Sequence, residues 1–445
     1  MQASRRTFLK QAVASAAAAP FLLPSHVWAA QPKPNSRLTM GFIGMGTQNR
    51  GLLGGFLGQE TRVLAVCDVD ATRRNDAKKR VDDHYADKAQ KRDGCAAYSD
   101  FREIINRKDI DAVCIATPDH WHTIITLAAL RSGKDVYCEK PLTHNIHEAV
   151  EVIRAVDAHK RVLQTGSMQR SSKEFRVACE LVRNGAIGKL LRVECSFGNP
   201  GVPCNLPEQP MEPGLDWNLW LGPAPTRPYS SVLSPRGIHK HFPDWRNYRE
   251  YGGGMVTDWG AHHLDIAQWG LGTDDGGPVE VLPPEKPGAK RGAKLVYANG
   301  VTVEHKNGFG AHFYGTEGEV RVNRGQFVFK RGDKTIASFT GREEERKTSC
   351  AAQVQEAERA FLKDAKVRLY VSKNHVSDFM ECVAARRKPI TSEQVGGRSA
   401  ICCHLMNLAY YHGKKIQWDP KTFAFAGGTG DPKWLSRDYR SPWSV

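Results

Sequence analysis

The chain has 445 residues, with 63 Lys and Arg against 48 Asp and Glu, so its formal net charge is +15. This length suffices for two domains, and a content of 40% hydrophobic and 25% charged residues argues against a disordered or membrane-embedded protein. The positive surplus would suit nucleic acid, but the basic residues are scattered and form no nucleic-acid-binding motif. We therefore expect a solvated basic surface and no nucleic-acid partner, while an anionic partner in the cell envelope stays open.

The first 29 residues have the pattern of a cleaved export signal. Arg5 and Arg6 precede a short Ala-rich apolar run that ends in a small-residue cleavage site at 27–29. The stretch SRRTFLK resembles the twin-arginine export motif, which implies export of a folded protein by the twin-arginine machinery, with its cofactor already inserted. The apolar run is too short, and too interrupted by proline, to span a membrane. We expect residues 1–29 to be removed and the mature protein to be periplasmic or otherwise extracytoplasmic, with no stable membrane span.

The 11 cysteines do not suggest a disulfide framework or a zinc ribbon, because no two of them form a C-x-x-C pair. Cys67, Cys114 and Cys195 lie inside apolar, strand-like runs, which is typical of small core residues.

A strand, a glycine turn and a helix start follow one another near the beginning of the mature chain. Residues 38–43 are apolar, Gly44 and Gly46 flank the turn, and a helix is predicted from about Gln48. Backbone N–H groups in such a turn, together with the helix N-terminus, form a cradle for phosphate. Asn49 stands where the third glycine of G-x-G-x-x-G would be. The candidate cofactor contacts in this segment are Gly44, Met45, Gly46, Asn49 and Arg50.

The next predicted strand ends in Asp68, 22 residues after Gly46. An acid at this place hydrogen-bonds ribose hydroxyls and repels a 2′-phosphate, which favours NAD over NADP. Arg73 and Arg74 follow closely and could accommodate a phosphate. A helix cap is the structural alternative for Asp68.

Strands and helices then alternate at the spacing of a parallel, doubly wound sheet, and we assign residues 30–166 to one Rossmann domain. Ligands bind at the carboxyl ends of strands in such sheets. Two further strand ends therefore supply candidate cofactor contacts. These are Thr117, Pro118 and His120 at one strand end, and Glu139 and Lys140 at the next.

Lys140 is followed by Pro141 at the end of an apolar strand. A lysine held at the edge of a crevice can hydrogen-bond or protonate an alcohol or carbonyl oxygen. A lone lysine is usually a solvated surface residue, but the strand end, the proline and the upstream glycine turn favour a functional role here.

Residues 167–445 are predicted to form a second domain. The stretch 294–330 alternates apolar and polar residues around Asn-Gly and Glu-Gly turns, which indicates antiparallel sheet. The loop-rich, aromatic stretch 199–251 suits either a sugar face or plain packing. We predict a charged surface excursion over 333–371, helices near the C-terminus, and a tail extended over the surface.

Asp258 and His262 lie four residues apart in a predicted helix, so they share one face. Removing hydride from an alcohol also requires a proton acceptor, and a histidine whose pKa a carboxylate raises is suited to that task. A surface ion pair is one alternative. A metal site that also uses His263 and Asp265 is another, although spacing alone does not fix its geometry.

The segments GFIGMGTQNRG, AVCDVD, CIATPDHWH, YCEKPL and the D-x-x-x-H pair resemble, in order and spacing, the Gfo/Idh/MocA oxidoreductases. The resemblance implies an N-terminal Rossmann domain and a C-terminal domain with a large, open-faced, mainly antiparallel sheet. It implies that Lys140 lies beside the nicotinamide and the substrate, that Pro141 is often cis, and that His262 acts as acid or base with Asp258 as its neighbour. By analogy alone, it also implies a homodimer or homotetramer.

We therefore expect an exported oxidoreductase that transfers hydride between NAD and a sugar or polyol, with Lys140, His262 and Asp258 as catalytic residues and no metal. NADP is less expected than NAD. Free NAD is absent outside the cytoplasm, so the cofactor should be tightly bound. An NAD-dependent glycoside hydrolase or lyase with transient oxidation, and a non-catalytic nucleotide-holding protein, are the alternatives.

Overall fold

The computed structural model describes residues 37–445 apart from 60, 88–93 and 342–346. The predicted export signal, residues 1–29, lies outside the described residues. Within the described part of the chain, no helix is long and apolar enough to cross a membrane.

The first sheet has six strands in the order β3-β2-β1-β4-β5-β6, and every pairing is parallel. This confirms the predicted Rossmann-type sheet. The strand β3 is only three residues long, and no apolar run had indicated it. The strands are β1 Thr39–Ile43, β2 Arg62–Cys67, β3 Ala96–Tyr98, β4 Ala112–Ile115, β5 Asp135–Cys138 and β6 Leu163–Thr165.

Helices cover both faces of this sheet, as a parallel sheet buried on both sides requires. One apolar layer involves α5 (Phe101–Ile105), α6 (Asp119–Arg131) and α7 (Ile146–His159). The other involves α3 (Thr47–Gly58), α4 (Ala71–Asp87) and, from much later in the chain, α13 (His375–Ala385).

Helix α13 is thus part of the core of the first domain, although it lies in the segment assigned to the second. The ring of Phe379 in α13 packs edge-on against Phe56 of α3 (6.1 Å between centroids) and Tyr137 of β5 (5.8 Å). The last strand of the parallel sheet ends at Thr165, next to the domain boundary predicted at residue 166. That boundary stays a prediction, because α13 belongs to the first core but lies after it.

The second sheet has ten strands in the order β14-β13-β12-β11-β7-β10-β9-β8-β15-β16. Only the β7–β10 pairing is parallel, so the mainly antiparallel prediction is confirmed. The strands are β7 Leu190–Cys195, β8 Glu280–Leu282, β9 Lys294–Val296, β10 Thr302–His305, β11 Ala311–Gly315, β12 Gly318–Asn323, β13 Gln326–Arg331, β14 Lys334–Phe339, β15 Ile416–Asp419 and β16 Ala424–Ala426.

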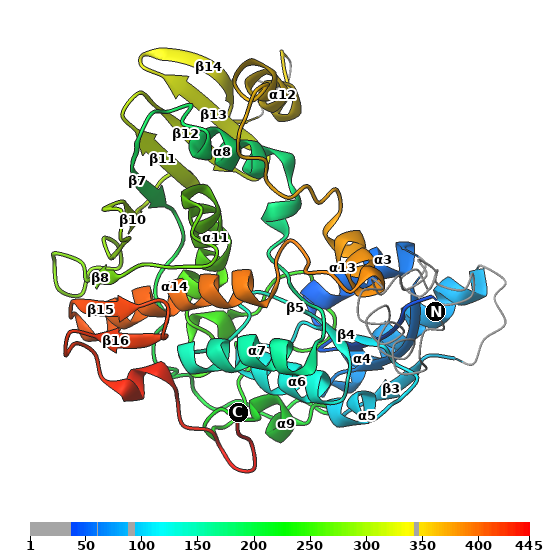
Figure 1. Ribbon diagram of the computed structural model, residues 1–445. Helices are drawn as coiled ribbons and strands as arrows, with labels where there is room; N and C mark the ends of the chain where they lie inside the picture. Colours follow the sequence, from blue (N-terminus) through cyan, green and yellow to red (C-terminus); the bar gives the residue numbers. More distant parts are fainter. Residues whose placement is uncertain (1–36, 60, 88–93, 342–346) are drawn as a thin grey trace, which may run out of the picture. The chain divides into compact units, whose positions relative to one another are not determined.

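Helices α8 (Lys173–Arg183), α11 (Gly260–Leu271) and α12 (Cys350–Phe361) pack on this sheet, and α14 (Glu393–His412) also contacts its strands β8 and β9. The long helix α14 packs against both α11 and α7, so it contacts elements of both domains. Figure 1 shows α14 running from the second sheet towards α7 and β5.

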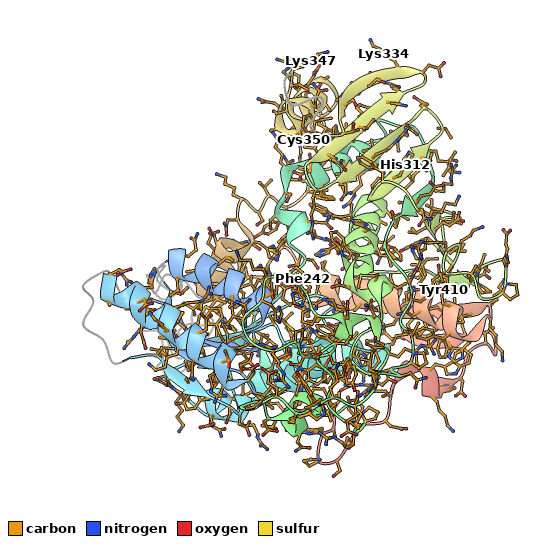
Figure 2. All side chains as sticks on the ribbon, turned by 180° about the vertical axis from the view of Figure 1, so that it is seen from behind. Phe242, His312, Lys334, Lys347, Cys350 and Tyr410 are labelled. Carbon is orange, nitrogen blue, oxygen red and sulfur yellow. The ribbon has the colours of Figure 1, made fainter. Side chains whose placement is uncertain are left out.

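The predicted surface excursion over 333–371 is wrong. Residues Lys334–Phe339 form the edge strand β14, and α12 covers the sheet with buried Val354 and Ala357. Lys334 and Cys350 mark the beginnings of these two elements in Figure 2. In the sequence, the charged run REEERK at 342–347 separates the two short apolar patterns and obscured both of them.

The predicted surface tail is confirmed, because residues 430–445 are all exposed or half-buried, and the structure adds contacts with the first domain. The short helix η3 (Pro432–Leu435) is followed by Tyr439 and Trp443, and both rings pack against the apolar layer of α5 and α6. All eleven cysteines are free thiols, and nine of them are buried, as expected for core residues.

Candidate active site

A cavity of about 380 Å³ lies along the carboxyl ends of the parallel strands. Residues that follow four strands line it: Gly44 after β1, Asp68 after β2, Thr117 after β4 and Lys140 after β5. Parallel strands bring their carboxyl ends to one edge, which is why residues distant in the chain meet here.

The glycine turn has the geometry of an anion cradle. Gly44 has φ +80°, and a Cβ there would lie 2.9 Å from the backbone N of Thr117, so no other residue fits. Around Gly46 no atom lies within 4 Å of such a Cβ, so this side of the turn is open to the cavity. Gly46 directly precedes α3, whose N-terminus favours negative charge. These features fit the diphosphate of a dinucleotide.

Asp68 both lines the cavity and holds the turn. Its Oδ2 accepts the N–H of Met45 (2.6 Å) and its Oδ1 accepts the N–H of Asp70 (2.9 Å). Burial raises the pKa of Asp68, although Arg73 opposes that rise. The position suits ribose hydroxyls.

The two arginines that could have accommodated a 2′-phosphate are already engaged. Arg73 donates to Ser234 Oγ (3.3 Å) and to the carbonyl oxygen of Pro235, and Arg74 donates to the carbonyl oxygen of Asp68 (2.6 Å). Their engagement favours NAD over NADP.

Four predicted cofactor contacts do not line the cavity, namely Met45, Asn49, Arg50 and His120. Asn49 is buried and braces the turn: its Nδ2 donates to the Ile43 carbonyl oxygen (3.1 Å), and its Oδ1 accepts from the Cys114 thiol (3.2 Å). His120 contacts the Trp220 carbonyl oxygen through Nε2 (3.0 Å), and burial lowers its pKa to about 3. Asn49 and His120 thus contact residues that line the cavity or its turn without lining it themselves.

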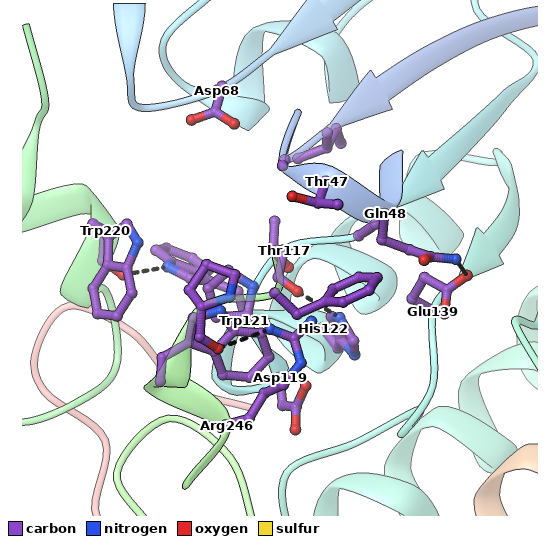
Figure 3. Close-up of a pocket in the computed structure, with 18 of the residues that line it drawn as sticks. Thr47, Gln48, Asp68, Thr117, Asp119, Trp121, His122, Glu139, Trp220 and Arg246 are labelled. Carbon is purple, nitrogen blue, oxygen red and sulfur yellow. Dashed lines mark hydrogen bonds between the residues drawn. The ribbon is translucent and has the colours of Figure 1, made fainter. Parts of the chain in front are cut away.

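His122 connects two strand ends. Its ring nitrogens lie 2.8 Å from the Pro141 carbonyl oxygen and 2.9 Å from that of Thr117. Figure 3 shows the contact with Thr117, and also the bond that Gln48 Nε2 donates to Glu139 Oε1 (2.9 Å). Burial lowers the pKa of His122 to about 4, although the two carbonyl oxygens, each of which needs an N–H donor, oppose that lowering.

Lys140 pairs with Asp258 inside the cavity. The Lys140–Pro141 peptide bond is cis, as the resemblance implied. Lys140 Nζ donates to Asp258 Oδ1 (2.5 Å) and to the Asp258 carbonyl oxygen (3.0 Å). Burial alone would raise the pKa of Asp258, but Lys140 and Arg246, whose Nε lies 3.5 Å from Asp258 Oδ1, together hold it below its ordinary value.

His262 lines the same cavity, but the expected rise in its pKa is wrong. The carboxylate of Asp258 turns to Lys140, and burial lowers the pKa of His262 well below its ordinary value, with further lowering by Lys140 and Arg324. The short helix α10 (Met255–Asp258) ends at Asp258, and α11 begins at Gly260. Trp259, the single residue between them, is in the right-handed helical conformation (φ −86°, ψ −29°), so the expected pair is replaced because the Asp258 carboxylate binds Lys140.

The four residues considered for a metal do not converge on one point. Asp265 accepts two bonds from Arg170 (both 2.8 Å), and His263 Nδ1 lies 2.6 Å from the Ser196 carbonyl oxygen. In the part of the chain that the structure describes, no group of three His, Cys, Asp or Glu side chains is arranged to hold a metal ion.

Models of two parts of one family match this chain. The description "Oxidoreductase family, NAD-binding Rossmann fold" matches residues 38–167, and "Oxidoreductase family, C-terminal alpha/beta domain" matches residues 186–319. The first match contains the glycine turn and Lys140, and the second contains Asp258 and His262.

The chain belongs to the Gfo/Idh/MocA oxidoreductase family. The inositol 2-dehydrogenase of Rhodococcus jostii is 35% identical over 128 residues, which are 28% of this chain and 35% of that protein. A second inositol 2-dehydrogenase, from Mycolicibacterium gilvum, is 37% identical over 128 residues, 28% of this chain and 37% of that protein. The chain thus matches little more than a third of the length of these curated relatives.

Solved structures show the same fold over most of the chain. A levoglucosan dehydrogenase in complex with NADH and levoglucosan has a TM-score of 0.56 at 20% identity, covering 86% of this chain and 99% of that one. The aldose-aldose oxidoreductase of Caulobacter crescentus, complexed with glycerol, has a TM-score of 0.56 at 18% identity, with the same coverage.

In this Gfo/Idh/MocA chain, some residues that line the cavity lie outside the motifs recognised in the sequence. Arg246, in the short helix η2 (Asp244–Asn247), contacts Asp258 and lies beside Asp119 in Figure 3. Burial and the nearby Asp258 raise the pKa of Asp119 well above its ordinary value, which favours the protonated acid. The only signal for Arg246 was the aromatic composition of 199–251: the guanidinium lies over the rings of Trp245 (4.3 Å) and Phe242 (5.1 Å). Phe242 is labelled in Figure 2.

Proposed function

We propose that this protein is an NAD-dependent dehydrogenase that oxidises a hydroxyl group of a sugar or polyol, or catalyses the reverse reduction. The observation that carries this proposal is that the Lys140–Asp258 pair and neutral His262 line the same cavity as the glycine turn and Asp68. A proton-handling group and a dinucleotide cradle in one cavity are the two requirements of alcohol oxidation.

The roles of the side chains follow from their hydrogen bonds. When NAD is bound, its nicotinamide supplies the acceptor for the hydride that leaves the carbinol carbon. An ammonium has three N–H donors, and Asp258 takes two of those of Lys140. The third can donate to the substrate oxygen and hold it in place. Neutral His262 has an unprotonated ring nitrogen that can accept the hydroxyl proton as the carbonyl forms, although its lowered pKa makes it a weaker base than an ordinary histidine.

We also propose that the cofactor stays bound between turnovers. The clasp, which we define as residues 234–243, crosses beside the start of α3. Thr47 Oγ1 donates to the carbonyl oxygens of His241 (2.9 Å) and His239 (3.3 Å), and Arg50 donates to that of His239. His239 and Phe242 of the clasp also line the cavity. A segment fastened to the rim beside the glycine turn would slow cofactor release.

Export supports the same proposal from a different direction. The SRRTFLK motif favours transport of a folded protein, which would carry its nucleotide out of the cytoplasm. Replacing Arg5 and Arg6 by Lys should leave the protein in the cytoplasm. Normal export of that double variant would contradict the twin-arginine route.

The activity is tested with the purified full chain. First, mass spectrometry of the native protein identifies the nucleotide that it carries. Then a panel of sugars, polyols and aryl glycosides is screened for NADH formation and phenol release. NADH formation that Lys140→Ala abolishes is the expected result. Phenol release without NADH accumulation would instead indicate a glycosidase, and a retained nucleotide with no turnover would indicate a binding protein.

A further inference from the structure

The end of the cavity beside β3 has a wall of aromatic rings. Phe101 follows β3, and its ring packs edge-on against Trp121 of α6, with centroids 5.5 Å apart. Both residues line the cavity, together with Leu219 and Trp220 of the short helix α9 (Trp217–Leu221). In the strand order β3-β2-β1-β4-β5, this wall begins at the edge opposite to Lys140. It lies on the same side of the glycine turn as Asp68, which follows β2.

A distant part of the chain packs directly behind this wall. The ring of Trp443 lies edge-on to Trp121 (4.7 Å between centroids, 75° between planes) and tilted against Phe101 (6.2 Å). Arg102 covers Trp443 from another side, with its guanidinium carbon 5.5 Å from the ring centroid. Trp443 is not among the residues that line the cavity, so it acts on the wall through Phe101 and Trp121.

The same segment also fixes the end of α9. Arg440 Nε donates to the Gly222 carbonyl oxygen (2.7 Å), and its Nη1 and Nη2 donate to Asn218 Oδ1 (2.6 Å) and O (2.7 Å). Gly222 lies in close contact with the indole ring of Trp121, because a Cβ at Gly222 would lie only 2.1 Å from that ring. Trp121 Nε1 in turn donates to the carbonyl oxygens of Leu219 (3.0 Å) and Trp220 (3.1 Å).

The segment is anchored in a buried polar site, so its position is well defined. Glu148 of α7 is fully buried, and its Oε1 accepts from Tyr439 Oη (2.8 Å) and from Arg437 (3.1 Å). Arg437 also donates to the His120 carbonyl oxygen (2.8 Å). Glu148 Oε2 would keep the donors Thr123 and the His144 N–H, but Oε1 would lose its bonds from Tyr439 and from the positively charged Arg437, which makes release of the segment costly.

We propose that residues 437–443 form a positioning element for the adenosine half of the cofactor, with Trp443 holding Phe101 and Trp121 in place. This inference rests on the proposed NAD site. Aromatic rings at the β2–β3 side of a dinucleotide cradle offer a planar apolar surface to a purine base, and their orientation depends on what packs behind them.

The test compares two tryptophans of the same part of the chain. Trp443→Ala removes the ring behind the wall, and Trp443→Phe keeps an aromatic ring there. Trp434→Ala is the matched control, because Trp434 stacks on His412 (3.7 Å) in the second domain and does not line the cavity. Binding of NAD, AMP and nicotinamide mononucleotide to protein freed of nucleotide is measured by calorimetry, with the thermal midpoint recorded for each variant.

Trp443→Ala should lower the affinities for NAD and for AMP by a similar factor, about three- to tenfold, which corresponds to the loss of one or two aromatic contacts. Nicotinamide mononucleotide should bind as before, and Trp443→Phe should restore most of the affinity. Trp434→Ala should change none of the three affinities. Equal weakening of all three ligands by Trp443→Ala, or unchanged AMP binding in a folded Trp443→Ala protein, would overturn the inference while leaving the NAD site intact. Failure of the wild-type protein to bind either NAD or AMP would overturn the proposed function itself.

Discussion

The two ends of the cavity differ in chemistry and in construction. Beside β3 the wall contains the aromatic rings of Phe101 and Trp121, next to Ser99 and Asp100, and the rings are supported from the other end of the chain. Beside β5 the residues are charged or titratable, and Lys140, Asp258 and Arg246 are joined by ion pairs.

This difference separates recognition from chemistry. An aromatic wall can bind through shape and apolar contact, with little dependence on pH or on any single proton. The charged end depends on which groups hold protons, because His262 must be neutral and Lys140 must be a donor. Substitutions at the two ends should therefore change different constants.

The largest effect is expected for Lys140→Ala. Loss of the donor that positions the reactive oxygen should lower kcat by about 10²–10⁴-fold, the usual range for a positioned proton-handling group. The dissociation constant of NAD should change little, which would sharpen the contrast with Trp443→Ala. Steady-state kinetics and calorimetry measure the two quantities. Lys173→Ala is the control, since Lys173 pairs with Glu358 on the surface. A kcat within threefold of wild type would rule out the role of Lys140.

A smaller loss is expected for Asp258→Asn, which keeps the shape but removes the charge that holds Lys140. We expect kcat to fall about 10- to 100-fold, because a charge-assisted hydrogen bond is replaced by a neutral one. Asp244→Asn, an exposed acid that also lines the cavity, is the matched control. Similar kinetics for the two variants would show that Asp258 does not orient Lys140.

The pH profile tests the charged end directly. A lowered pKa means that His262 stays neutral, and so able to accept a proton, as the pH falls below its ordinary value of 6.5. Activity should therefore persist below pH 6.5 and be lost only as the pH falls through the lowered pKa. Arg324→Gln removes one of the positive charges that lower this pKa, so the acid limb should move to higher pH by less than about one unit. A wild-type limb at pH 6.5 or above would contradict the assignment of His262.

The smallest effect is expected for Thr47→Ala, which removes the hydroxyl that holds the clasp. A neutral hydrogen bond contributes about 0.5–1.5 kcal/mol, so NAD dissociation should accelerate about two- to tenfold. Stopped-flow displacement of bound NADH measures this rate. Thr422→Ala serves as the control, because its hydroxyl bonds only to Asp419 on the surface. An unchanged rate would mean that this bond does not limit release.

The sequence predicted most reliably what lies at strand ends. Gly44, Asp68 and Lys140 each follow a predicted strand, and the parallel topology alone brings such ends together. Arg246 and Trp443 could not be predicted in this way. Neither follows a strand of the parallel sheet, and each lies far along the chain from the strand ends that form the cavity. The partner of Asp258 was mistaken for a different reason. The spacing to His262 suggested a pair along one helix, whereas the Asp258 carboxylate binds Lys140, which comes from a strand end more than a hundred residues earlier in the chain.

The position of α13 has a consequence for synthesis and for protein engineering. Residues 38–167 contain all six parallel strands, but Phe379 of α13 covers the rings of Phe56 and Tyr137. A fragment cut after residue 167 would expose these aromatic rings to water and tend to aggregate. In the cell, the nascent chain cannot complete this layer until the ribosome has passed residue 385, so nucleotide loading should follow translation of nearly the whole polypeptide.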